Sequence, residues 1–219
     1  MKQLIIALVA IVMPALSVAA GGGHNEYVVK APINLNDKVS QQKGAQIFVN
    51  NCLGCHSAKY MRYSRVAEDL GIPEDIMLEN LAFTTDKIGE TMVSSIPADL
   101  GKKWFGTVPP DLTLEARLRG ADWLYSYLTN FYADESRPFG VNNHVFKDVG
   151  MPHVLENMEA ELGEDEFKER MADLTNFMVY MAEPIRAERE YLGKIVIGFL
   201  FILLIPVYFM NREYWKDVH

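Results

Sequence analysis

Residues 51–56 read Asn51-Cys52-Leu53-Gly54-Cys55-His56, and they hold both cysteines of the 219-residue chain. Two sulfurs three residues apart on a helical turn can reach both vinyl groups of one porphyrin, and the adjacent histidine then lies beneath the iron. C-x-x-C-H is accordingly the attachment signature of c-type haem. The stretch predicts one covalent haem c, attached through Cys52 and Cys55, with His56 as an axial ligand of the iron.

The same cysteine pair has two other interpretations. A redox dithiol belongs with a thioredoxin-like strand–helix–strand pattern, which the sequence lacks. A zinc site needs two further ligands from the few remaining histidines or from carboxylates. With only two cysteines in the chain, a disulfide-dense secreted scaffold is excluded.

Three segments around the motif have helical periodicity. Residues 39–50 run directly into Cys52, and residues 121–132 place apolar side chains on one face. Residues 164–181 show the clearest pattern, a stripe at 4-3-4-3 spacing. The stripe consists of Phe167, Met171, Leu174, Met178 and Met181. Loops rich in proline and glycine separate these segments and strand signals are sparse, so we expect an all-α domain with long loops whose middle is filled by a cofactor.

The N-terminus is typical of an export signal. Lys2, a short apolar run and small residues before Gly21 are the parts of a secretory signal peptide, which we place at residues 1–20. The apolar run is short for a membrane span and contains Pro14. An uncleaved N-terminal helix is the alternative.

The C-terminal region is typical of a membrane anchor. Residues 191–210 are almost continuously apolar, and at 1.5 Å per residue they span about 30 Å, the thickness of the hydrocarbon core. A buried core helix is the alternative. Because a signal peptide directs the chain behind it out of the cytoplasm, we predict residues 21–190 as a periplasmic domain and residues 211–219 as a cytoplasmic tail. The chain would cross a bacterial inner membrane once, with the lipid bilayer as one of its partners.

Charge narrows the choice of other partners. The chain has 21 Lys and Arg against 29 Asp and Glu, a net charge of -8, which argues against nucleic acid. An acidic cluster lies in the C-terminal third. It comprises Glu156, Glu159, Glu161, Glu164, Asp165, Glu166 and Glu169. The cluster is either a solvated face or a surface that steers a basic protein toward the haem.

A low-spin electron carrier needs a sixth iron ligand. Methionines on the helical stripe are expected in the core, whereas Gly150-Met151-Pro152 forms a turn without helical period. Met151 is therefore the first candidate, since a thioether is soft, neutral and favours ferrous iron. His144 and His153 are the alternatives, and a loop methionine that only fills a gap is another.

Several short motifs occur in an order that resembles the cytochrome c1 family. They are Cys52-Leu53-Gly54-Cys55-His56-Ser57, Tyr60, Tyr63-Ser64-Arg65, Pro109-Pro110-Asp111-Leu112, Arg119, Gly150-Met151-Pro152 and Ala182-Glu183-Pro184. The resemblance implies a class-I-like cytochrome c domain with one C-terminal transmembrane helix. It also implies roles at the haem for Pro110 beside the haem edge, for Arg119 facing a propionate and for Met151 as axial ligand. By residue type alone, Pro110 fits a plain turn and Arg119 a solvated charge. One departure is His153, since the family often has a second proline close after its methionine.

The resemblance implies a subunit of ubiquinol–cytochrome c reductase, the respiratory bc1 complex. Such a subunit takes one electron from the Rieske iron–sulfur protein, sits beside cytochrome b, and passes the electron to a soluble c-type cytochrome. It contributes no acid, base or nucleophile and is not catalytic alone. One alternative is a membrane-anchored cytochrome c that feeds a terminal oxidase or nitric-oxide reductase. Another is a haem sensor or peroxidase.

Overall fold

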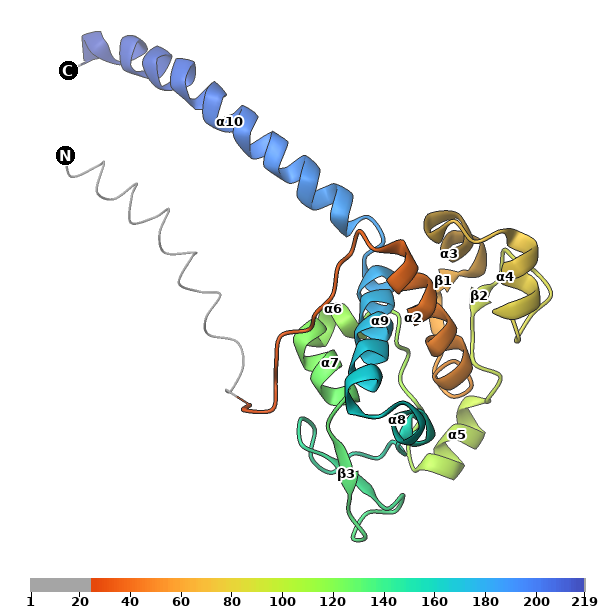
Figure 1. The fold of residues 1–219 in the computed structure, drawn as a ribbon. Coiled ribbons are helices and arrows are strands. Elements are labelled where there is room, and N and C mark those ends of the chain that lie inside the picture. The colour runs from red at the N-terminus through yellow and green to blue at the C-terminus, as the bar shows by residue number, and fades with distance from the viewer. Residues whose placement is uncertain (1–24, 219) are drawn as a thin grey trace.

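The computed structural model describes residues 25–218, so the signal peptide expected at residues 1–20 lies outside the described residues. Helices dominate the described chain (Figure 1). They are α2 (Lys38–Asn51), α3 (Tyr63–Leu70), α4 (Glu74–Asn80), α5 (Ala98–Phe105), α6 (Glu115–Arg119), α7 (Ala121–Leu128), α8 (Glu156–Leu162), α9 (Glu164–Ala182) and α10 (Arg186–Tyr214), with a 3₁₀ turn η2 (Lys216–Val218). The prediction of a mostly helical domain followed by one apolar C-terminal helix is confirmed.

Four short strands form two small sheets. β1 (Ala58–Arg62) pairs antiparallel with β2 (Thr91–Met92), and β3 (Phe131–Ala133) pairs antiparallel with β4 (Val141–Asn143). In the second sheet Phe131 lies opposite Asn143 and Ala133 opposite Val141, which makes a hairpin. Neither sheet has the width to form a core of its own. Both sheets therefore support loops around the helices.

The core is built on the crossing of α2 and α9, which lie against each other in Figure 1. Phe48 on α2 and Phe177 on α9 are fully buried, with ring centroids 5.6 Å apart. The helices approach closely because Gly44 has no side chain: a Cβ there would lie 2.1 Å from the Asp173 carbonyl oxygen. All five members of the predicted stripe on α9 are buried. This crossing fixes the end of α2, from which the haem motif continues.

Helix α7 is shorter than the predicted 121–132 segment, because residues after Leu128 bond back onto it. Thr129 Oγ1 donates to the Tyr125 carbonyl at 3.0 Å, and Asn130 Nδ2 donates to the Ser126 carbonyl at 2.8 Å. Side chains that satisfy the last carbonyls in this way end a helix. Phe131 then begins strand β3, so the C-terminal end of the helix prediction was wrong.

Helix α10 extends away from the rest of the described chain (Figure 1), and none of its residues is buried. It is long and apolar enough to cross a membrane, with Pro206 inside it. Its 29 residues measure about 43 Å, so the helix exceeds the hydrocarbon core at its ends.

One carboxylate ties the junction of α9 and α10 together. Glu183 pairs with Arg189 on α10 at 2.6 Å and with Arg117 on α6 at 3.3 Å. The hydrogen bond from Arg189 lowers the pKa of Glu183 below its ordinary value. Glu183 therefore connects the start of the anchor helix to α6 through its two ion pairs.

Candidate haem site

The C-x-x-C-H motif forms a tight turn at the end of α2. The Cys52 amide donates to the Phe48 carbonyl at 2.8 Å, and the His56 amide donates to the Cys52 carbonyl at 2.8 Å. Both cysteines are free thiols, Cys52 buried and Cys55 half-buried. Burial, with a smaller contribution from Cys55, raises the pKa of the Cys52 thiol to about 12. Neither sulfur is used in a disulfide, so both remain for thioether bonds.

The His56 imidazole is held from one side. Its Nδ1 lies 2.8 Å from the carbonyl oxygen of Pro110 and donates to it, which leaves Nε2 free to bind a metal. Burial lowers the pKa of His56, while the Pro110 carbonyl and the carboxylates of Glu115 and Asp111 oppose that shift. The net lowering of the pKa favours the neutral ring, which is the form that ligates iron.

The segment that carries Pro110 is tied to the residues just after His56. The Leu112 amide donates to the Ser57 carbonyl at 2.8 Å, and the Lys59 amide donates to the Asp111 carboxylate at 2.9 Å. A proline has no backbone N–H, so an apolar proline pair can cover a cofactor edge without leaving a buried donor unpaired. The contact that the structure gives Pro110 is its carbonyl bond to His56, which sequence reasoning did not anticipate.

Arg119, at the end of α6, lies on aromatic rings. Its guanidinium carbon is 4.7 Å from the ring centroid of Trp123 and 5.6 Å from that of Phe146. Its Nε is 3.6 Å from the Glu115 carboxylate. Stacking orients the planar guanidinium and leaves its edge for an anion. This position suits the expected partner, a haem propionate.

An aromatic column links Arg119 to Met151. Trp123 and Tyr127, one turn apart on α7, stack with ring centroids 5.1 Å apart. The Tyr127 hydroxyl donates to the Met151 sulfur at 3.5 Å. Burial raises the pKa of Tyr127, partly offset by Arg119, so the hydroxyl stays a donor. The sequence pattern did not indicate that Trp123 and Tyr127 stack on each other or that Tyr127 contacts Met151.

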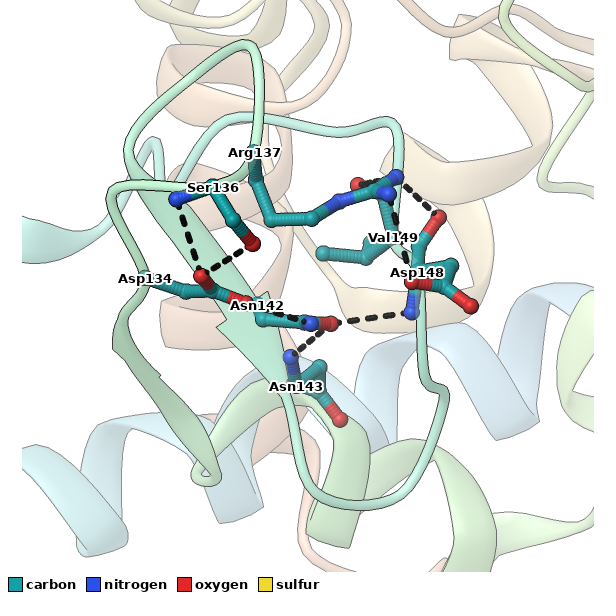
Figure 2. Close-up of polar contacts among 7 residues, drawn as sticks. All are labelled: Asp134, Ser136, Arg137, Asn142, Asn143, Asp148 and Val149. Atoms are coloured by element: carbon teal, nitrogen blue, oxygen red, sulfur yellow. Dashed lines mark hydrogen bonds and ion pairs between the residues drawn. The ribbon is translucent and has the colours of Figure 1, made fainter.

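Polar side chains of the β3–β4 hairpin contact the loop that leads to Met151 (Figure 2). Arg137 donates to the carbonyls of Asp148 and Val149, and Asn142 accepts from the Asp148 amide. Sequence reasoning missed both residues. Loops rich in proline and glycine were expected between the helices, but nothing in the sequence indicated which residues such a loop would hold in place.

The two alternative histidines are engaged elsewhere. The His153 ring stacks on Phe131 at 4.6 Å, and its Nε2 is 2.8 Å from the Glu159 carboxylate. The exposed His144 lies between the rings of Tyr27 and Tyr132, with centroids 4.5 and 4.3 Å away. Both rings have aromatic partners that a move onto iron would remove.

The residues present fit a haem c. They comprise two free thiols, an imidazole with Nε2 available, a thioether and an arginine set on aromatic rings. The Glu115 carboxylate interacts with two of these groups: it lies 3.6 Å from Arg119 Nε, and its charge raises the pKa of His56. The motif, the neutral histidine and the apolar C-terminal helix define a membrane-anchored c-type cytochrome.

Residues 27–218 match the model of the Cytochrome C1 family, and the chain belongs to that family. It is 42% identical over 246 residues to "Cytochrome c1" of Allochromatium vinosum, with the whole of both chains covered. It is 40% identical to "Ammonia monooxygenase gamma subunit" of Nitrosomonas europaea, again over both whole chains. "Cytochrome b/c1" of Bradyrhizobium diazoefficiens is 24% identical, and the match covers 89% of this chain and 36% of that protein. Members of the family carry covalently bound haem c, and Cys52 and Cys55 have the spacing of its attachment motif.

Proposed function

We propose that this chain is the haem subunit of a bc1-type respiratory complex, where it accepts one electron from a Rieske iron–sulfur protein and passes it to a soluble c-type cytochrome. Family membership supports this, and the Bradyrhizobium relative joins cytochrome b and c1 in its name. The observation that carries the proposal is the geometry of the His56 imidazole, whose Nδ1 is held by the Pro110 carbonyl while Nε2 stays available for iron. An imidazole oriented in this way needs little rearrangement when the oxidation state changes.

Met151 is the second axial ligand in this proposal. Its sulfur is oriented by the Tyr127 hydroxyl, whereas His144 and His153 are engaged with aromatic rings and a carboxylate. When bound, haem c supplies the one-electron redox chemistry, and the chain's side chains set its potential. A neutral thioether favours ferrous iron, so Met151 raises the potential toward the range in which a Rieske centre can donate.

The substitution Met151→Leu tests this ligand. Oxidised protein should lose its far-red sulfur-to-iron charge-transfer band, the potential should fall sharply and carbon monoxide should bind the reduced form, while haem stays attached. Met178→Leu is the matched control, because Met178 is buried on the α9 stripe and the exchange nearly conserves volume. If Met151→Leu keeps the band and the potential of the wild type, the ligand is another residue and this assignment is wrong.

The haem domain faces the periplasm in this proposal, with residues 21–190 exported and residues 211–219 in the cytoplasm of a bacterial cell. The anchor helix alone does not set this orientation, since basic residues occur on both sides of it. The composition of residues 1–20, with Lys2 before an apolar run, supports export.

The acidic cluster supports a basic soluble cytochrome as electron acceptor. It occupies α8 and the first turns of α9, and α8 begins five residues after Met151. Three of its carboxylates have a partner among the described residues: Lys168 pairs with Glu164, Arg170 pairs with Glu166, and the His153 ring lies 2.8 Å from the Glu159 carboxylate. The other four have no ion pair within residues 25–218, namely Glu156, Glu161, Asp165 and Glu169. This excess of negative charge steers a cationic partner during approach.

A further inference from the structure

One guanidinium holds the main chain just ahead of Met151. Arg137 lies in the connection between β3 and β4, and its Nη2 donates to the carbonyls of Asp148 at 2.7 Å and Val149 at 3.3 Å. Its Nη1 bonds the Asp148 carboxylate at 3.2 Å. The Arg137 side chain is only 24% exposed, and its Nε is buried without a partner among residues 25–218. The guanidinium contacts that Figure 2 draws all lead to Asp148 and Val149 in the loop.

Asn142 binds the backbone amide of Asp148. Its side-chain oxygen accepts from the Asp148 amide at 2.9 Å, and its Nδ2 donates to the Asp134 carboxylate at 2.9 Å. Asp134 is fixed in turn by the amide and hydroxyl of Ser136. Both backbone polar groups of Asp148 are thus bonded to hairpin side chains, as Figure 2 shows.

The held residue has an unusual backbone. Asp148 has φ +60°, and it is the single non-glycine residue with positive φ in the described range. Such a conformation persists where its surroundings over-determine it. Val149 follows and is buried. The hydrogen bonds to Asp148 and the burial of Val149 together fix the main chain two residues before Met151.

We infer that Arg137 is a positioning residue for Met151, whose bonds to the Asp148 and Val149 carbonyls keep the thioether in place when the iron is oxidised. The inference rests on the proposed role of Met151 as ligand. A neutral thioether binds ferric iron less well than ferrous iron, so in the oxidised state the loop must supply the restraint that the bond itself lacks. Hydrogen bonds from a charged donor are about twice as strong as neutral ones, which suits them to that task.

The test is Arg137→Gln in the full-length, haem-loaded chain, with imidazole as a competing ligand. A glutamine is too short and has too few donors to replace three contacts to Asp148 and Val149. We expect ferric Arg137→Gln protein to bind imidazole at least about tenfold more tightly than wild type and to show a weaker charge-transfer band. Haem attachment and the ferrous spectrum should be unchanged.

Two variants isolate the cause. Arg170→Gln is the matched control, because it removes an arginine that pairs with Glu166 on α9, outside the loop. Asp148→Asn removes the carboxylate partner but retains the backbone carbonyls and a residue that tolerates positive φ, so imidazole affinity should stay near wild type. A purely structural role for Arg137 would lower Tm without changing imidazole affinity.

Wild-type imidazole affinity and band intensity in Arg137→Gln would overturn the inference. If that variant does not accumulate, Arg137→Lys decides by the same measurement. The lysine keeps the positive charge, but its single ammonium cannot make the forked contacts of the guanidinium to both carbonyls. Imidazole affinity should therefore lie between those of wild type and Arg137→Gln. Comparison with Met151→Leu separates the two proposals. A band that survives Met151→Leu removes the ligand assignment and the inference together, whereas a band lost there with no effect in Arg137→Gln removes only the inference.

Discussion

Gly44→Ala should destabilise the protein although it adds one methyl group to a helix. The new Cβ would lie 2.1 Å from the Asp173 carbonyl oxygen and 2.7 Å from the Phe177 Cβ. The first neighbour is backbone, which cannot rotate away, so α2 and α9 would have to separate by about 1 Å. The pair of buried rings at the crossing, Phe48 and Phe177, would lose contact.

Two free-energy terms oppose each other in this variant. Overpacking of a core costs about 1–3 kcal/mol, and a backbone clash puts Gly44→Ala at the upper end. Alanine regains about 1 kcal/mol of helix propensity over glycine. The net loss is therefore about 2 kcal/mol, which lowers Tm by roughly 4–8 °C for a chain of this size. Gly44→Val should lose more, because a β-branched side chain adds bulk with less gain in propensity.

Thermal unfolding of the haem-loaded protein, followed by far-UV circular dichroism, measures this effect. Gly89→Ala is the control, since a Cβ at Gly89 meets no atom within 4 Å, and its Tm should stay near that of wild type. A Gly44→Ala protein as stable as wild type, or more stable, would refute the close crossing of α2 and α9.

Three further predictions concern Tyr127, Glu183 and the acidic cluster. Tyr127→Phe removes the hydrogen bond to the Met151 sulfur, so the potential should fall, by at most roughly 40 mV if the whole bond of about 1 kcal/mol is made in the reduced state, while the charge-transfer band remains in the oxidised spectrum. Arg189 lowers the pKa of Glu183, so stability from this pair is present at pH 7 and is lost as pH falls through the lowered pKa. Glu183→Gln should accordingly lower Tm slightly at neutral pH, and a gap from wild type that persists in acid would contradict this. Electron transfer to a basic cytochrome should slow as salt rises past about 0.1 M, where the Debye length is about 10 Å. Replacing the four unpaired carboxylates of the acidic cluster by amides should flatten that dependence, and an unchanged salt profile would leave the cluster a solvated face.

Local patterns predicted much of the fold. The α9 stripe followed a helical period over five positions, and every member is buried, because periodicity reports directly which face a helix turns inward. The apolar run at residues 191–210 predicted a separate C-terminal helix, and α10 (Arg186–Tyr214) contains that run. Helices α3, α4 and α5 are short and were not predicted, since fewer than three turns carry too little periodicity. The end of α7 depended on the side chains of Thr129 and Asn130, whose bonds to carbonyls a propensity pattern does not show.

The chemistry of the protein can be inferred from its amino-acid sequence: two thiols and an imidazole at C-x-x-C-H spacing, a methionine in a turn and an apolar C-terminal run. These features are local, so they can be recognised without knowing their neighbours in space. How the candidate ligands are held depends on tertiary contacts. The Pro110 carbonyl reaches His56 across 54 residues, and Tyr127 reaches the Met151 sulfur across 24. Arg137 reaches the loop before Met151 across 11 and 12 residues. Such hydrogen bonds form only where packing brings a donor and an acceptor within about 3 Å of each other. The spacing of residues along the sequence does not indicate that distance.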